Sequence, residues 1–171
     1  PKEMFKTLQN QENLELLDVP KDSKLFLFLT KIQDEVHRYA ITYHRNIKAK
    51  GNVKGKNLES KMDFVCDELD FDRTTDIAIL QGNVNLTDVE NDVKANAQYI
   101  EYNQKTEIAI LQIQINLVQK DNVCTGSYAI YKKNEKLLDL MGNAKIKKKK
   151  DTFRAQQIFF NLDTQDITLI G

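Results

Sequence analysis

The feature that most constrains this chain is a unit of 29 to 31 residues that recurs from about residue 51 to the last residue. Aromatic residues spaced 31, 29 and 29 apart mark successive units, and a leucine follows each aromatic nine residues later. Such self-similarity predicts stacked supersecondary units, each of which buries its apolar face only against its neighbours. The aromatic–leucine pairs are Phe71 and Leu80, Tyr102 and Leu111, Tyr131 and Leu140, and Phe160 and Leu169.

Apolar residues within each unit keep one parity, which is typical of a strand with one buried face. Leu80, Gly82 and Val84 illustrate the pattern, because alternate residues of a strand lie on the same face. Clusters such as Asn103-Gln104 separate these runs and indicate turns. Glycine suits a strand bend, but the second unit has Ile113 where the others have glycine, so we expect a different bend there. The sequence therefore predicts a mainly β fold with about two strands per unit.

The sequence motif of the repeat resembles that of the LptA/OstA family of periplasmic lipopolysaccharide transport proteins. Residues 95–103 read ANAQYIEYN and are followed by IAIL at 108–111, which matches the family unit. Residues 80–84 (LQGNV) and 140–144 (LMGNA) repeat its second half, whereas residues 112–115 (QIQI) depart from it. The resemblance covers residues 51–171 and implies an antiparallel, open β-jellyroll with an apolar interior.

This resemblance also implies a function. In the family, the interior carries the acyl chains of lipopolysaccharide across the periplasm, and the end strands join further jellyrolls by backbone pairing at exposed edges. It implies no cofactor. From the pattern alone, the same residues form an ordinary packed core, so a ligand-free structural β-repeat protein is an alternative. The expected lipid-binding residues are Phe64, Leu69, Phe71, Leu80, Val84, Leu86, Ile100, Tyr102, Leu111, Ile115, Leu117, Tyr131, Leu140, Ile146, Phe153, Ile158, Phe160 and Leu169.

Composition argues against several other classes of site in residues 51–171. The 25 basic and 25 acidic residues of the chain balance, which gives no general argument for nucleic-acid binding. This part lacks histidine, a catalytic Ser/His/Asp set and a P-loop, so we expect neither an enzyme nor a metal site. Cys66 and Cys124 are expected to be buried thiols, and residues 67–72 to supply turn and outward carboxylates. The basic run 145–150 is expected to be a solvated turn or edge or, less often, a contact for lipid phosphates.

The segment before the repeat is typical of an amphipathic helix of about 20 residues. Ser23 is an N-cap type, and an apolar stripe runs at helical spacing from Leu25 to Tyr43. Residues 14–48 resemble the RNase H-like endonuclease region of UvrC, a subunit of the bacterial nucleotide-excision-repair nuclease. That resemblance matches His37 to a metal-binding histidine. The family's metal-binding aspartates would lie upstream of Pro1, so we expect no nuclease activity and no DNA binding.

The sequence thus predicts two parts, a helical segment at 1–48 and β-jellyroll repeats at 51–171. The resemblances disagree about compartment, since one family works in the periplasm and the other in the cytoplasm. No signal peptide is visible, and both ends have the character of a fragment, with the array continuing past Gly171. Our preferred hypothesis is that unrelated coding sequences were joined near residue 50. A genuine fusion is the alternative for the junction, and an inactive UvrC fragment is an alternative for function.

Overall fold

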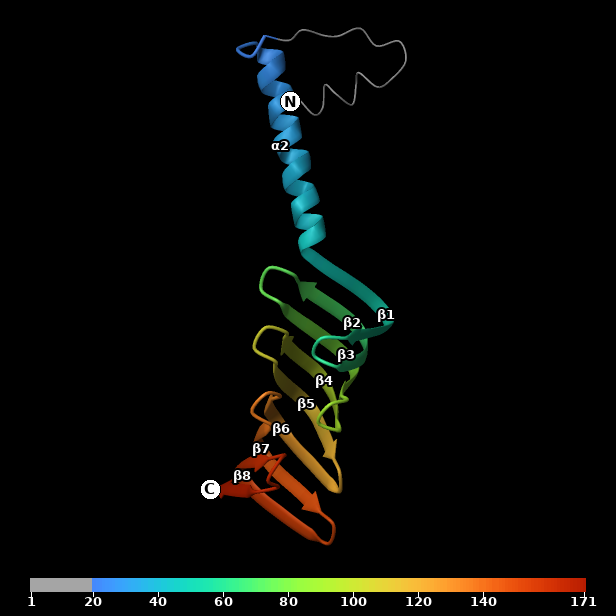
Figure 1. Cartoon of the computed structure of the whole chain (residues 1–171), viewed down its shortest axis with the longest axis vertical. Coiled ribbons are helices and arrows are strands. Elements are labelled where there is room, and N and C mark those ends of the chain that lie inside the picture. Colours follow the sequence, from blue (N-terminus) through green and yellow to red (C-terminus); the bar gives the residue numbers. More distant parts are fainter. Residues whose placement is uncertain (1–19) are drawn as a thin grey trace. The chain divides into compact units, whose positions relative to one another are not determined.

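The computed structural model describes residues 20–171, together with all side chains in that range except those of residues 37–45. Within these residues, the helix α2 (Lys24–Arg45) is followed by a single sheet in which each strand pairs antiparallel with the next along the chain (Figure 1). The helix belongs to one compact unit, which ends at Arg45, and the sheet to another, Asn46–Gly171, which we call the β-unit. The strands are β1 (Asn46–Asn57), β2 (Met62–Asp72), β3 (Ile77–Asp88), β4 (Val93–Asn103), β5 (Ile108–Gln119), β6 (Asn122–Lys132), β7 (Leu137–Lys148), β8 (Asp151–Asn161) and β9 (Ile167–Ile170).

Four of the turns that follow strands are fixed by an Asn or Asp at the end of the preceding strand. The Oδ1 atom of Asp88 accepts hydrogen bonds from the backbone N–H groups of Glu90 (3.0 Å) and Asn91 (3.1 Å). A short polar side chain can bond the backbone in this way because it reaches the N–H groups two and three residues ahead. Three other strand ends make the same pair of bonds, at Asn57, Asn103 and Asn161.

Strands β1, β3, β5 and β7 are each bent once near the middle, by two consecutive residues with positive φ. In β3 these are Gly82 (φ 75°) and Asn83 (φ 44°), and the pairing of β3 with β4 is interrupted between Gln81 and Val84. Glycine has no Cβ and asparagine tolerates the left-handed region, so the dipeptide adopts this bend at low cost. The same dipeptide bends β1 at Gly51-Asn52 and β7 at Gly142-Asn143.

The expectation of a different bend in the second unit is wrong. Ile113 and Gln114 have φ values of 65° and 55°, so β5 bends in the same way as its neighbours. Strand pairing explains this result, because the registers with β4 and β6 both skip the same place. A β-branched residue is unfavourable in this conformation, and the ladders on both sides hold it there.

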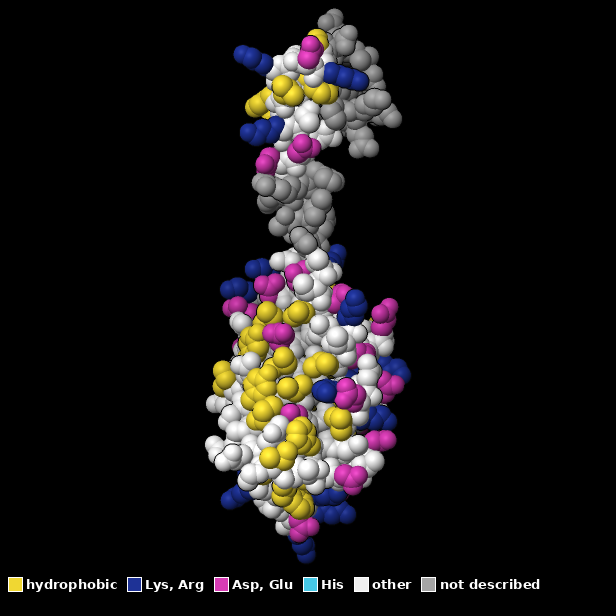
Figure 2. Space-filling model, turned by 90° about the vertical axis from the view of Figure 1, so that its left-hand side faces the viewer, with side chains coloured by type: hydrophobic (Ala, Val, Ile, Leu, Met, Phe, Trp, Pro, Cys, Tyr) yellow, Lys and Arg dark blue, Asp and Glu magenta, His cyan; other side chains and the backbone are white. Residues whose placement is uncertain are grey.

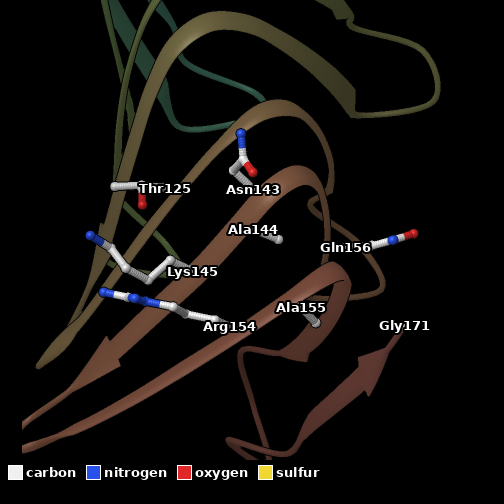
Figure 3. Close-up of a pocket in the computed structure, with 8 residues that line it drawn as sticks. All are labelled: Thr125, Asn143, Ala144, Lys145, Arg154, Ala155, Gln156 and Gly171. Carbon is white, nitrogen blue, oxygen red and sulfur yellow. The ribbon is translucent and has the colours of Figure 1, made fainter.

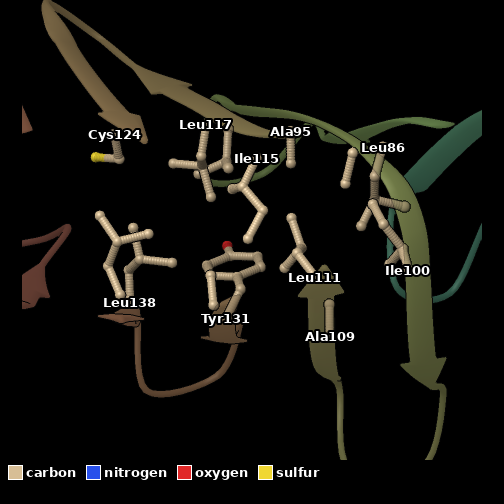
Figure 4. Packing of buried hydrophobic residues seen from close by; sticks show 14 of the residues in the cluster. Leu86, Ala95, Ile100, Ala109, Leu111, Ile115, Leu117, Cys124, Tyr131 and Leu138 are labelled. Carbon is tan, nitrogen blue, oxygen red and sulfur yellow. The ribbon is translucent and has the colours of Figure 1, made fainter. Parts of the chain in front are cut away.

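The bends fold the sheet over on itself, so that two halves of one sheet face each other. Figure 4 shows Ile115 and Leu117 directed toward Leu111 and Tyr131 of the opposite half, with Cys124 on the same side as Leu117. These residues belong to one continuous cluster of buried apolar side chains that runs from β2 to β8. The core therefore lies inside the fold, along its whole length.

The predicted helix is confirmed as α2. The hydroxyl of Ser23 accepts a hydrogen bond from the backbone N–H of Phe26 at 3.1 Å, which is the expected N-cap contact. Strand β1 begins directly afterwards at Asn46, ahead of the junction expected near residues 49–51. The strand starts early because Asn46–Lys50 pairs with Glu68–Asp72. In the part of the chain that the structure describes, no helix is long and apolar enough to span a membrane.

Candidate functional site

The interior face of the folded sheet is formed by alternate residues of successive strands. Register aligns these residues in rows: Leu80 of β3 pairs with Leu69 of β2 and Ile100 of β4. The side chains of Leu80 and Ile100 are buried, and that of Leu69 packs against the buried cluster. The rows make the apolar face continuous from strand to strand.

Most of the expected lipid-binding residues lie in this interior. The fully buried members of the set are Leu80, Val84, Leu86, Ile100, Tyr102, Leu111, Ile115, Leu117, Tyr131, Leu140, Ile146, Ile158 and Phe160. Phe64, Leu69, Phe71 and Phe153 are half-buried toward the ends of the sheet. Leu169 is 47% exposed, since it lies on the final strand and has a neighbour on one side only.

Sequence reasoning missed three large interior side chains, Met62, Leu138 and Leu162. The parity rule would have found the first two, because Met62 is two residues before Phe64 and Leu138 is two before Leu140. Leu162 follows the last residue of β8 but keeps the same parity, because it is two residues after Phe160, so the rule would have found it too.

Side chains fill the middle of the interior. Leu111, Leu117 and Ile146 each have 0% exposure, so no water-sized space borders them. A lipid chain could enter only if the facing halves moved apart or side chains were displaced, because protein interiors are close-packed.

One edge of the interior is closed by polar contacts between turns from the two halves, which we call the seam. The phenol of Tyr131 donates a hydrogen bond to Oδ2 of Asp88 at 2.6 Å, and Asn91 Nδ2 donates to the same oxygen at 2.7 Å. Tyr131 and Asp88 are 43 residues apart in sequence. Burial, and then the bond to Asp88, raise the pKa of the Tyr131 phenol, so it remains a donor.

A lysine strengthens the seam beside this tyrosine. Nζ of Lys133 lies 2.8 Å from Glu90 and 4.0 Å from Glu107, and only 5% of its side chain is exposed. Burial lowers the pKa of Lys133, but the bond to Glu90 and the neighbouring carboxylates outweigh burial and raise it overall. The bond from Lys133 lowers the pKa of Glu90. Both groups are therefore charged at neutral pH.

A second set of seam contacts closes the interior near β9. Gln165 Nε2 donates to the backbone carbonyl of Leu162 at 2.6 Å and to Oε1 of Gln119 at 3.1 Å. Asn122 Nδ2 donates to Oε1 of Gln165 at 2.7 Å. At the other end, the buried hydroxyls of Ser60 and Tyr102 lie near each other, but neither makes a hydrogen bond of normal geometry among the described residues. The seam is thus held by polar side chains in its middle and near β9, and less firmly beside β1.

The described side chains of Cys124, Asp67 and Asp70 in the sheet are buried or held in structural contacts. Burial raises the pKa of the Cys124 thiol to about 12, so it is not a thiolate nucleophile at neutral pH. Asp67 accepts a hydrogen bond from Asn83 at 2.9 Å, and Asp70 pairs with Lys48 at 3.2 Å. Among side chains 20–36 and 46–171, no group of three or more His, Cys, Asp or Glu could hold a metal ion. His37 and His44 lie outside the described side chains.

A polar pocket of about 540 Å³ lies at the C-terminal end of the sheet (Figure 3). In that view Lys145 and Arg154 extend in the same direction from adjacent strands, with Thr125 near them. These side chains make it unlike the apolar interior. The pocket is lined by Thr125, Asn143, Ala144, Lys145, Arg154, Ala155, Gln156 and Gly171.

Comparison with known proteins identifies the β-unit. The family model for "LptA/(LptD N-terminal domain) LPS transport protein" matches residues 63–166. A similar solved structure is LptH of Pseudomonas aeruginosa, the LptA-homologous periplasmic component of a lipopolysaccharide transport device. The TM-score is 0.60 at 16% identity, over 67% of this chain and 85% of that one. This fold confirms the expected open antiparallel jellyroll.

A second similarity concerns a short stretch only. UvrABC system protein C of Streptococcus uberis and of Streptococcus agalactiae are each 46% identical to this chain over 43 residues. The match covers 25% of this chain but spans only 7% of the length of those relatives. It confirms the resemblance to UvrC at the level of a segment.

Proposed function

Because the chain belongs to the LptA/LptD N-terminal domain family of lipopolysaccharide transport proteins, we propose that residues 51–171 act as a non-enzymatic periplasmic module that holds lipopolysaccharide acyl chains between the two halves of its folded sheet. The observation that carries this proposal is the continuous apolar face from β2 to β8. Each methylene moved from water into such an interior contributes about 0.8 kcal/mol. Several acyl chains therefore bring enough free energy to separate some of the packed side chains.

The seam is the proposed entry route. Its bonds join side chains in turns, whereas the opposite margin is formed by continuous strands that bend through Gly82-Asn83 and its equivalents. Opening the seam breaks a few side-chain bonds, each with a net worth of about 0.5–3 kcal/mol. Opening the bends would break backbone ladders on several strands. Acyl chains should therefore enter between the turns and lie against residues such as Leu111 and Leu117.

Photo-crosslinking of the full chain tests this proposal with a matched pair of positions. Phe160 is 0% exposed on the inner face, and the adjacent Phe159 is 40% exposed on the outer face. A photoreactive phenylalanine at position 160 should crosslink to lipopolysaccharide, and one at position 159 should not. Equal yields at both positions, or no yield at position 160 when the variant is folded, would contradict an interior site.

We further propose that the free edges of the sheet pair with other jellyroll proteins. Strands β1 and β9 each have a neighbour on one side only, so one row of their backbone N–H and C=O groups is unpaired by the sheet. Leu169 and Ile170 on β9 are about half exposed. A strand added there would continue the interior face into a second molecule.

We assign no nuclease activity to the UvrC-like segment. The match spans only 7% of the length of that protein, and the segment that resembles it, residues 14–48, includes α2. We propose that it does not cut DNA. Metal-dependent nicking of a supercoiled plasmid by the purified full chain would overturn this view, provided that the activity co-purifies with the chain.

A further inference from the structure

The outer face of the β7–β8 hairpin presents cations from both strands and from the turn that joins them. Lys145 pairs directly with Arg154 across the strands. Both side chains face outward, because the neighbouring Ala144 and Ile146 are buried on the inner face. Lys147 is the next outward residue of β7. We call Lys145, Lys147, Lys149, Lys150 and Arg154 the basic hairpin.

These cations are not neutralised within the β-unit. None of the five forms an ion pair with another described residue. The nearest acidic residues in sequence are Asp151, which pairs in register with Lys148, and Asp139 on β7, which accepts a hydrogen bond from Gln157 at 2.8 Å. Figure 2 shows Lys and Arg side chains gathered around the lower end of the β-unit, where β7 and β8 lie.

The opposite end of the same sheet is built differently. On β1, Lys48, Lys50 and Lys56 each lie within 3.6 Å of a carboxylate on β2. Like charges directly opposite each other in a ladder destabilise a sheet, whereas opposite charges stabilise it. The Lys145–Arg154 pair therefore costs stability that a partner of negative charge would recover.

The chemistry of the basic hairpin fits a bilayer surface of anionic lipid. Its cations are spread over an outward sheet face and a turn, so several headgroups can be contacted at once. Four of the five are lysines, which act as point charges, whereas base recognition favours arginine forks and aromatic stacking. The other outward residues near them are Val123, Thr125 and Thr152, which supply no aromatic ring.

We propose that the basic hairpin docks the β-unit onto anionic phospholipid headgroups at a membrane surface. This inference is independent of lipid capture in the interior, since all five cations are outside the seam and the apolar cluster. Near such a surface each cation strengthens binding about fivefold, and the effect fades within a Debye length. Removal of three cations should therefore weaken binding about 100-fold.

Flotation of the full chain with vesicles tests the proposal. The vesicles are phosphatidylcholine alone, or phosphatidylcholine mixed with phosphatidylglycerol, each at low and high salt. The test variant is Lys145→Gln/Lys147→Gln/Arg154→Gln, in which all three substitutions are on the outer face. The matched control is Lys48→Gln/Lys50→Gln/Lys56→Gln, which removes the same charge from cations that already have partners.

The expected result is salt-sensitive binding to the anionic vesicles that the test variant loses and the control retains. Circular dichroism should show the same strand content for both variants. Equal binding to neutral vesicles, or equal loss in the control, would overturn the proposal. Binding to duplex DNA that is tighter than vesicle binding and lost in the test variant would overturn it in favour of a nucleic acid. Crosslinking at position 160 should be unchanged in the test variant, which separates this inference from the proposed interior site.

Discussion

Replacing Ile113 by glycine should stabilise the protein, although the substitution deletes a large apolar side chain. Ile113 has φ 65°, and its side chain is 58% exposed at the bend of β5. The other bends use glycine at this position, as in Gly82 and Gly142. The substitution therefore removes conformational strain and little buried area.

The expected gain is about 1 kcal/mol. A residue with a Cβ in the left-handed region costs about 1–2 kcal/mol, and a β-branched residue lies toward the upper value. Glycine offsets about 0.5–1 kcal/mol of this gain, because it has more conformational freedom than isoleucine in the unfolded state and loses it on folding. A gain of this size should raise the midpoint of thermal unfolding by about 2–4 °C.

Far-ultraviolet circular dichroism with urea or heat measures the change, because the chain contains no tryptophan to report by fluorescence. Gly51→Ala is the reciprocal control: φ is 79° and an added Cβ would meet nothing within 4 Å, so only backbone strain is introduced. Gly142→Ala adds a contact of 2.9 Å to the Ser127 side chain and should destabilise more. If Ile113→Gly lowered stability while Gly51→Ala raised it, backbone strain at the bends would be refuted as the deciding effect.

Three other predictions concern the seam and the free edge. Tyr131→Phe removes one hydrogen-bond donor from the buried carboxylate of Asp88 and should lower the free energy of unfolding, measured in urea, by about 1–3 kcal/mol. An unchanged midpoint of urea unfolding would show that the Tyr131–Asp88 bond does not contribute to stability. The raised pKa of Lys133 means that its contribution is complete below the ordinary value of 10.5 and is lost as pH rises through the folded-state value. The lowered pKa of Glu90 gives a contribution present above 4.5 and lost as pH falls through the folded-state value. The free energy of unfolding should thus fall at alkaline pH through Lys133 and at acidic pH through Glu90. In urea titrations at different pH values, Lys133→Met should flatten the alkaline decline. An identical alkaline decline in the variant and the unsubstituted protein would contradict this role of Lys133. Leu169→Asp should block edge-to-edge assembly in light scattering with little loss of monomer stability, whereas Thr168→Asp on the outer face should not; equal assembly in both variants would argue against pairing through β9.

The sequence by itself determined what depends on neighbours along the chain. The period of 29 to 31 residues and the parity of its apolar positions were enough to predict strands with one buried face, whereas their antiparallel order was implied by the family resemblance. The Ser23 cap and the turn residues Asn57 and Asp88 act over two or three residues, so their effect is visible without a fold. The resemblance of its sequence motifs then indicated the family of the β-unit.

The tertiary structure decided what depends on residues far apart. Ile113 looks unlike a bend residue, but ladders on both sides force β5 to bend with its neighbours, and one unfavourable φ costs less than many lost backbone bonds. Tyr131 and Asp88 gave no local sign of a partnership, because a contact across 43 residues exists only after the sheet folds over. Leu169 repeats the spacing of buried leucines and is nevertheless exposed, since burial requires a strand on each side and β9 has one.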